Sequence, residues 1–332
     1  MSRSARSVAR ALQGLFSVYK PPGVHWKRVR DAVETNLLQE LNSLKQPDAR
    51  QLIRFLPVHA DGESETETNL TVVKLPALAD HPLVKGPEFV HLKVGTGHRL
   101  DVMSSGVFVL ALGHGNKQLP ELYNCHLTKD YTVKGFFGKA TDDFSDMGRL
   151  VEKTTYDHIT RDKLERIVAV IQGSHQKALL TYSGIDFKTQ EAYELASRGL
   201  LRPMQNSPPI ITGLRCVHFS PPNFTLEIQC LHETQKYLRR IVHEIGLELK
   251  STAVCTHVRR TRDGFFTLQD SLIRTRWDLQ SVQDALRGRG SKGKATLLES
   301  GLEPPAGETD RLQARGQRTT TGTLRTAQTG TS

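Results

Sequence analysis

Short apolar runs rich in β-branched and aromatic residues recur along the chain, and several are bounded by glycine, proline or asparagine. This pattern is typical of strands. The run at 107–110 contains only apolar residues, which predicts a buried strand. Side chains alternate in character over 131–136, which predicts another. Further strands are predicted at 15–19, 210–219 and 224–231, and over 252–272, where Asp263 and Gly264 turn the chain.

Other stretches predict helices. They lie at 28–44, 119–123, 160–173, 188–199 and within 232–249. The third has clear boundaries, because Thr160 can cap its start and Gly173 can end it. In the fourth, Tyr193 and Leu195 are expected to be buried. In the last, apolar residues at helical spacing define a buried face and leave Arg239 near the helix start.

The patterned part of the chain, 15–284, predicts one domain with an inserted segment at about 45–85, which we interpret as an exposed loop and a strand. Residues 1–14 are basic and contain serine. They fit a mitochondrial presequence, and they fit equally well a basic arm of an RNA-binding protein. Residues 285–332 consist mostly of small, polar and basic residues, so we expect a disordered polar tail.

Composition narrows the functional classes. Lysine and arginine total 45 against 35 acidic residues, a formal charge of +10, which suits a polyanionic partner such as nucleic acid. Such a charge also occurs in proteins that bind no RNA. No apolar run reaches roughly 18 residues, so no membrane span is expected. We expect no metal, because the four cysteines lack a CxxC pair and His232, Glu233, His243 and Glu244 lack HExxH spacing.

The stretch most relevant to chemistry is 93–110, KVGTGHRLDVMSSGVFVL, where a polar, glycine-rich turn leads into the predicted buried strand. The turn carries a lone acid, Asp101. Gly97 and Gly106 permit a sharp turn and the close approach of a ligand. An acid at the mouth of a strand fits a catalytic site, and the alternative is that Asp101 caps a turn.

Several motifs together resemble those of the TruB-type pseudouridine synthases. GHRLD followed by SSGVFVL is similar to the family's catalytic loop, in which an aspartate attacks a flipped uridine. In the family's order, the chain also contains KPPG, KDYTV, YLRRIVHEIG and VRRTRDGFF. The segment from Gly138 to Gly148 resembles the family's G-x-x-T-D segment. The resemblance covers roughly residues 15 to 280.

The resemblance implies an α+β fold with a long mixed, mostly antiparallel sheet and a central RNA-binding cleft flanked by helices. It implies an RNA pseudouridine synthase, an intramolecular transferase of the isomerase class, that needs no cofactor and no metal. Asp101 would be the nucleophile, Tyr131 would stack on the base and assist proton transfer, and Arg239 would orient Asp101. The residues expected to contact RNA are Lys20, His98, Arg99, Lys129, Arg259 and Arg260.

The loop around Asp101 departs from the family pattern. Bacterial relatives have G-H-x-G-x-L-D-P, whereas Thr96, His98 and Val102 stand at the histidine, second glycine and proline positions. The HRLD sequence is similar to the sister RluA branch, whose arginine enters the helix vacated by the flipped base. We therefore expect Arg99 or His98 to enter the RNA stack. We also expect no PUA-like RNA-binding module after the catalytic domain.

RNA is the expected partner, with mitochondrial mRNA, tRNA or rRNA as the substrate, and other mitochondrial RNA-processing proteins are candidate partners. We expect the mitochondrial matrix, with the cytoplasm or nucleus as the alternative compartment. The alternative function is a catalytically weak or inactive RNA-binding scaffold of a mitochondrial RNA-processing or ribosome-assembly complex.

Overall fold

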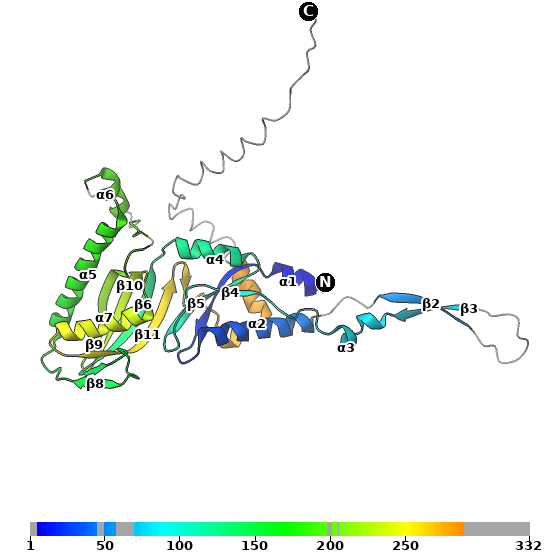
Figure 1. The fold of residues 1–332 in the computed structure, drawn as a ribbon, viewed down its shortest axis with the longest axis horizontal. Helices are drawn as coiled ribbons and strands as arrows, with labels where there is room; N and C mark the ends of the chain where they lie inside the picture. Colours follow the sequence, from blue (N-terminus) through cyan, green and yellow to red (C-terminus); the bar gives the residue numbers. More distant parts are fainter. Residues whose placement is uncertain are drawn as a thin grey trace, which may run out of the picture. The chain divides into compact units, whose positions relative to one another are not determined.

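A single large sheet organises the protein (Figure 1), whose computed structural model describes residues 5–44, 50–57, 70–186, 188–197, 201–204 and 206–288. The strands lie in the order β1 (Gly14–Lys20), β5 (Ser105–Leu112), β11 (Ala253–Asp263), β6 (Lys129–Phe137), β10 (Asn223–Leu231) and β9 (Ile210–Ser220). Two short strands join this sheet, β4 (Val94–Thr96) beside β5 and β12 (Phe266–Thr267) beside β11. Separate strand pairs are formed by β2 (Gln51–Pro57) with β3 (Leu70–Pro76), and by β7 (Lys139–Thr141) with β8 (Leu150–Lys153).

Strand direction in the large sheet is mixed. Strand β11 runs parallel to β5, where Arg260 pairs with Gly106, and the other described pairings are antiparallel. Helices pack on this sheet, so the predicted α+β class with a mixed, mostly antiparallel sheet is confirmed.

Strand β5 shows why the predicted apolar run is buried. Its side chains alternate between the two faces of the sheet, as in any strand. Phe108 and Leu110 belong to one hydrophobic cluster, whereas Val107 and Val109 belong to another. Because both faces of β5 are covered, all eight of its residues are buried.

The helices are α1 (Ala5–Ala11), α2 (Trp26–Ser43), α3 (Pro82–Lys85), α4 (Gly115–Asn124), α5 (Arg161–Ser183), α6 (Gln190–Ser197) and α7 (Gln235–Glu248), followed by a last helix at 279–288. Short 3₁₀ turns occur at Leu78–Asp80 and Arg274–Arg276. Helix α7 lies within the predicted stretch and begins after Thr234, whose hydroxyl accepts a hydrogen bond from the Tyr237 N–H at 3.2 Å. Its apolar face packs with α5 against strands β6, β10 and β11.

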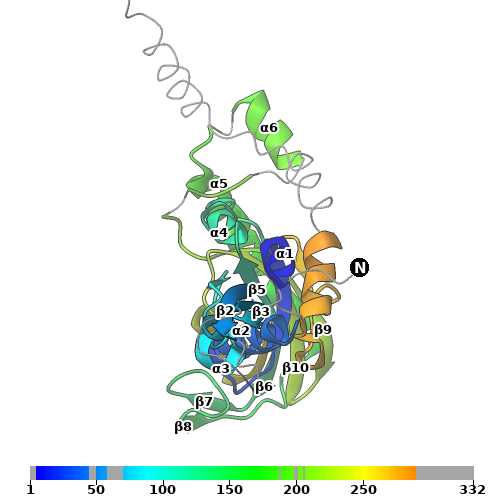
Figure 2. The same ribbon diagram turned by 90° about the vertical axis from the view of Figure 1, so that its right-hand side faces the viewer.

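The N-terminal residues belong to the folded core. Val8 and Leu12 pack in one cluster with α2, β1 and β5, and Leu286 from the last helix joins the same cluster. Figure 2 shows α1 and this last helix side by side. Ordered structure therefore extends beyond the predicted 15–284 domain at both ends. Residues 289–332, which include most of the predicted disordered tail, lie outside the described residues.

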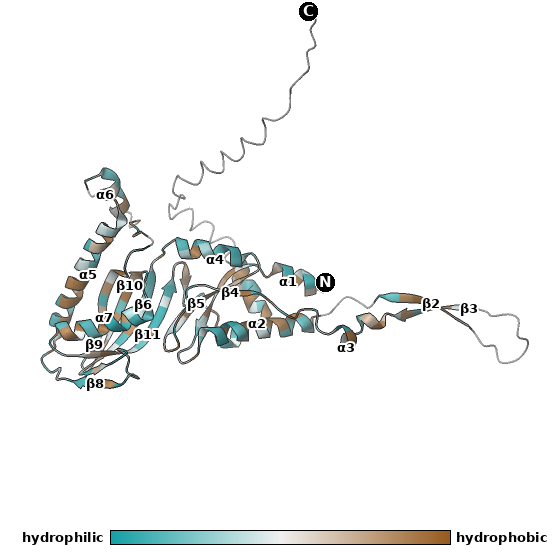
Figure 3. Ribbon diagram, in the orientation of Figure 1, coloured by the Kyte–Doolittle hydropathy of each residue, from teal (hydrophilic) through white to brown (hydrophobic). Residues whose placement is uncertain are grey.

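Three details differ from the sequence analysis. Helix α5 continues through Gly173 and ends ten residues later, where Gly184 adopts φ 68°. An interior glycine costs only about 1 kcal/mol, which the packing of the helix outweighs. Tyr193, predicted to be buried in α6, is 70% exposed. The inserted segment contains two strands instead of one, and Figure 3 shows apolar residues along β2. In this strand the Phe55 side chain is exposed.

Candidate active site

Asp101 lies in the loop before β5 and is held by two donors. The Ser104 N–H donates to Oδ1 of Asp101 at 2.7 Å, and Nη1 of Arg239 in α7 donates to Oδ2 at 2.5 Å. Burial, the largest single influence, raises the pKa of Asp101, but the hydrogen bonds from Ser104 and Arg239 together lower this pKa below its usual value. The carboxylate is therefore ionised and fixed in orientation at neutral pH, and the expected contact between Arg239 and Asp101 is present.

The side chain of Lys20 stabilises the loop that carries Asp101. Its side chain is fully buried, and Nζ donates to the carbonyl oxygens of Ser104 at 2.6 Å, Pro21 at 3.1 Å and Val102 at 3.2 Å. Burial lowers the pKa of Lys20 to about 8, despite the opposing charge of Asp101. The structure gives no support to the expected contact between Lys20 and RNA, because the ammonium group is buried and satisfies backbone carbonyls.

Arg260 supports the other end of the loop. It is fully buried, and its guanidinium donates to the carbonyl oxygens of His98 at 2.6 Å and Val107 at 2.9 Å. Asp263 lies 3.4 Å from Nη2 of Arg260 and balances its charge. The strands approach closely here, since a Cβ on Gly106 (φ 115°) would meet the Arg260 carbonyl oxygen at 2.0 Å. Arg260 thus holds the backbone at His98 and Val107, on both sides of Asp101.

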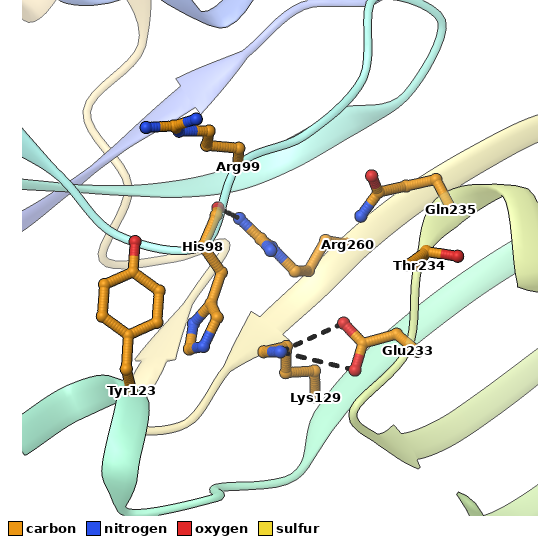
Figure 4. Close-up of a pocket in the computed structure, with 8 residues that line it drawn as sticks. All are labelled: His98, Arg99, Tyr123, Lys129, Glu233, Thr234, Gln235 and Arg260. Carbon is orange, nitrogen blue, oxygen red and sulfur yellow. Dashed lines mark hydrogen bonds and ion pairs between the residues drawn. The ribbon is translucent and has the colours of Figure 1, made fainter. Parts of the chain in front are cut away.

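A pocket of about 260 Å³ opens between the loop, strand β6 and the start of α7. Figure 4 shows its lining, which comprises His98, Arg99, Tyr123, Lys129, Glu233, Thr234, Gln235 and Arg260. Four of the six residues expected to contact RNA line this pocket. Asp101 belongs to the same loop as His98 and Arg99, three and two residues further along the chain, but it is not part of the lining.

Tyr131 differs in its surroundings from the expectation of an open stacking surface. Its side chain is 1% exposed, and its hydroxyl donates to Oε1 of Glu233 at 2.6 Å. Nζ of Lys129 lies 3.2 Å from the same oxygen. Burial and the negative charge of Glu233 raise the pKa of Tyr131 well above its usual value. A base can stack on this ring only if neighbouring side chains move.

The sequence analysis considered Glu233 only as a metal ligand and missed its contact with Tyr131. The two residues are 102 positions apart, so no local pattern connects them. The available signal was an acid directly before Thr234, which caps the helix that carries Arg239. In the described residues, no group of three or more His, Cys, Asp or Glu residues could hold a metal ion, and no helix there is long and apolar enough to cross a membrane.

Two of the expected RNA contacts are exposed arginines. The guanidinium carbon of Arg99 lies 4.5 Å from the centre of the Trp26 ring, at the start of α2. Arg259 lies on β11, where its guanidinium carbon is 5.9 Å from the centre of the Tyr19 ring. Both side chains are accessible, so each can meet an RNA strand without rearrangement of the core.

The chain belongs to the TruB family of pseudouridylate synthases, as the sequence predicted. Residues 88–236 match the N-terminal domain of this family. The chain is 65% identical to "Pseudouridylate synthase TRUB2, mitochondrial" of Xenopus tropicalis over 86% of its own length and 88% of that protein. It is 62% identical to the Homo sapiens protein of the same name, over 88% of each chain.

A solved structure described as the archaeal box H/ACA sRNP Nop10-Cbf5 complex is also similar, with a TM-score of 0.41 and 16% identity. The alignment covers 86% of the present chain and 57% of the solved one, so this protein spans little more than half of that relative's length.

Proposed function

We propose that this protein isomerises uridine to pseudouridine in RNA within mitochondria. Family membership supports the reaction, and the names of relatives more than 60% identical to the chain support the compartment. The formal charge of +10 supports a polyanionic substrate. The reaction rearranges atoms within one nucleotide, so its equation contains no co-substrate.

The ion pair between Asp101 and Arg239 is the observation that carries this proposal. Isomerisation requires cleavage of the bond between the sugar and N1 of the base, and an ionised carboxylate is a suitable nucleophile for such a step. Arg239 and Ser104 each hold one oxygen of Asp101, so the carboxylate is oriented before the substrate arrives. Lys20 then acts indirectly, by fixing the carbonyls of Val102 and Ser104, which follow Asp101 in the loop.

The target uridine must leave the RNA stack before Asp101 can reach it, at a cost of a few kcal/mol. The pocket beside the loop is the candidate site for the flipped base, because its polar lining offers both donors and acceptors to uracil. Arg99, on the rim, is the residue that we expect to occupy the space left in the stack. Arg259 is exposed on the neighbouring strand and is suited to bind phosphate.

The decisive experiment compares the wild type with Asp101→Asn. Short hairpin RNAs with uridine in the loop are incubated with each protein, and pseudouridine is mapped chemically. We expect pseudouridine with the wild type and none with Asp101→Asn, while RNA binding by the two proteins stays similar. The matched control is Asp157→Asn, at an exposed position, which should retain activity. Equal pseudouridine formation by Asp101→Asn would refute the assignment, and RNA binding without any product from the wild type would favour an inactive scaffold.

A further inference from the structure

A buried carboxylate forms part of the pocket wall and binds Tyr131. The Tyr131 hydroxyl donates to Oε1 of Glu233 at 2.6 Å, and Nζ of Lys129 approaches both carboxylate oxygens, at 3.2 and 3.4 Å. Only 1% of the Glu233 side chain is exposed, and 8% of the Lys129 side chain. Figure 4 shows the Lys129 and Glu233 side chains directed toward each other at the pocket. Burying a carboxylate is costly unless it is paired, and here Lys129 and Tyr131 are the partners that hold Glu233 at the pocket.

The sheet and α7 bring this group into the neighbourhood of Asp101. Across the strands, Gly106 of β5 pairs with Arg260 of β11, which pairs with Tyr131 of β6. Two strand spacings amount to about 10 Å, a distance that side chains and a nucleobase together can bridge. Two consecutive residues of α7 also connect Tyr131 with Asp101. Leu238 packs in the hydrophobic cluster that contains Tyr131, and Arg239 contacts Asp101.

The reaction must remove one proton from carbon. When C5 of uracil has replaced N1 as the atom bonded to the sugar, C5 still carries its hydrogen. That hydrogen must leave as a proton to restore the aromatic-like uracil ring. Asp101 is assigned to the sugar bond and is already held by two donors. A second group is therefore needed to accept the C5 proton.

We propose that Glu233 is the final acceptor of the C5 proton and that the Tyr131 hydroxyl relays the proton to it. This inference rests on the proposed function and assigns the step that follows the attack of Asp101. The C5–H proton moves to the Tyr131 oxygen while the hydroxyl proton of Tyr131 moves to Oε1 of Glu233. The electrons of the C5–H bond form the C5=C6 double bond while the π electrons of the C6=N1 bond move onto N1, which then takes up a proton from water. Glu233 returns its proton to water when the product leaves.

The environment of Tyr131 favours a relay over a free phenolate. Burial and the nearby carboxylate raise the pKa of Tyr131 well above its usual value, so the hydroxyl keeps its proton at neutral pH. A neutral phenol accepts a proton only if it loses its own at the same time. Glu233, at 2.6 Å, is placed to take that proton, and Lys129 balances the charge of the carboxylate.

Other nearby acids are already engaged. Asp130 accepts two hydrogen bonds from Arg262, each at 2.7 Å. Asp263 is buried beside Arg260 and His98, at 3.4 and 3.2 Å. Neither contacts the hydroxyl of Tyr131, whereas Glu233 does.

The test separates cleavage of the sugar bond from loss of the C5 proton. Glu233→Gln keeps the shape of the side chain but cannot accept a proton readily. Hairpin RNAs that the wild type modifies are prepared with three kinds of uridine, carrying hydrogen, deuterium or fluorine at C5. A fluorine at C5 leaves no proton to remove. Consumption of each RNA is then measured, with Glu165→Gln as the control, since Glu165 is exposed and paired with Arg161 in α5.

We expect Glu233→Gln to turn over normal uridine about 100-fold more slowly, a typical contribution of a general base. Its deuterium isotope effect should exceed that of the wild type, because C5 proton loss becomes limiting. Consumption of the fluorinated RNA should stay within about threefold of the wild type, since that substrate bypasses the step. An equal loss on both substrates, or normal activity on uridine, would overturn the proposal.

Two further results keep the inference distinct from the proposed function. If Glu233→Gln fails to fold, Tyr131→Phe takes its place, because it removes only the relaying hydroxyl, and the same readouts apply. Tyr131→Phe with an unchanged isotope effect and full activity would overturn the relay. Failure of the wild type to modify any RNA would instead refute the proposed function.

Discussion

Arg239 contacts Asp101 across 138 residues of sequence, and this single ion pair joins helix α7 to the loop before β5. The loop and the helix lie on different parts of the large sheet, so the contact exists only in the fully assembled fold. Together with the hydrogen bonds from Ser104, it lowers the pKa of the candidate nucleophile and fixes the orientation of its carboxylate.

Replacing Arg239 by Gln should lower turnover by about 100-fold, because the carboxylate loses an oriented, charge-assisted partner. The pKa of Asp101, now lowered by Ser104 and Arg239, should rise. Activity requires the ionised form, so the acidic limb of the kcat/KM profile should move to higher pH. The stability that the pair contributes is present above the usual aspartate pKa and is lost as the pH falls through the lowered one.

The neighbouring substitution Arg240→Gln is the matched control, because Arg240 forms an exposed pair with Glu244 in the same helix. It should leave both the rate and the profile close to those of the wild type. An unchanged acidic limb in Arg239→Gln would contradict the role given to this residue.

Lys20→Met should reduce kcat about tenfold or more while RNA affinity changes less than about twofold, because the side chain supports the loop and does not meet phosphate. The slope of log affinity against log salt should also stay unchanged. Arg259→Met provides the contrast, since Arg259 is exposed and its loss should reduce that slope by about 0.7 to 0.9. A smaller salt slope in Lys20→Met than in the wild type would indicate that Lys20 does contact a phosphate.

Lys20 should also affect the pH dependence of stability. Because its folded-state pKa is about 8 and its usual value is 10.5, the unfolded chain binds more protons between these values. The free energy of unfolding of the wild type should therefore increase with pH in this window, relative to that of Lys20→Met. Chemical denaturation at pH 8 and pH 10 measures this difference, and a decrease would contradict the buried ammonium group.

Arg99→Ala should weaken turnover more than RNA binding, because the guanidinium is expected to enter the stack only after the base has left. The control is Lys27→Ala, whose ammonium lies 5.8 Å from the centre of the same Trp26 ring but does not line the pocket. Single-turnover rates and equilibrium binding to the same hairpin RNA provide the two measurements. Equal activity of Arg99→Ala and the wild type would contradict the expectation that Arg99 enters the RNA stack.

Leu12→Ala should lower the free energy of unfolding by about 3 kcal/mol, the usual cost of a cavity at a fully packed leucine. Leu12 is 2% exposed and shares a cluster with α2 and β5. For the same reason, the mature mitochondrial protein should retain residues 8–12. N-terminal sequencing of protein recovered from mitochondria tests this expectation, and cleavage after residue 12 would contradict it.

Much of the fold could be predicted because its signals are local. The apolar run of β5 and the cap at Thr160 depend on neighbouring residues only, and both are found where predicted. The exposed fraction of a side chain is not local. Tyr193 lies at a helical position that suggests burial, yet its side chain is 70% exposed among the described residues.

The site was predictable only in part, for a related reason. Asp101 stood out because a lone acid preceded a buried strand. The burial of Lys20 could not be predicted from the sequence, because the loop carbonyls that it satisfies lie 82 and 84 residues away. Glu233 was missed because its partner Tyr131 belongs to another strand.

Strand β11 is the last long strand in the chain, yet it lies between β5 and β6, which precede it by more than 100 residues. During synthesis, β5 and β6 leave the ribosome with unpaired edges that wait for this strand. The large sheet is complete only after residue 263 has left the ribosome, and pairing between strands so far apart in the sequence is slow. A nascent chain that already contains Asp101, Tyr131 and Arg239 is therefore still inactive, and it is the stage at which we expect chaperones to be needed most.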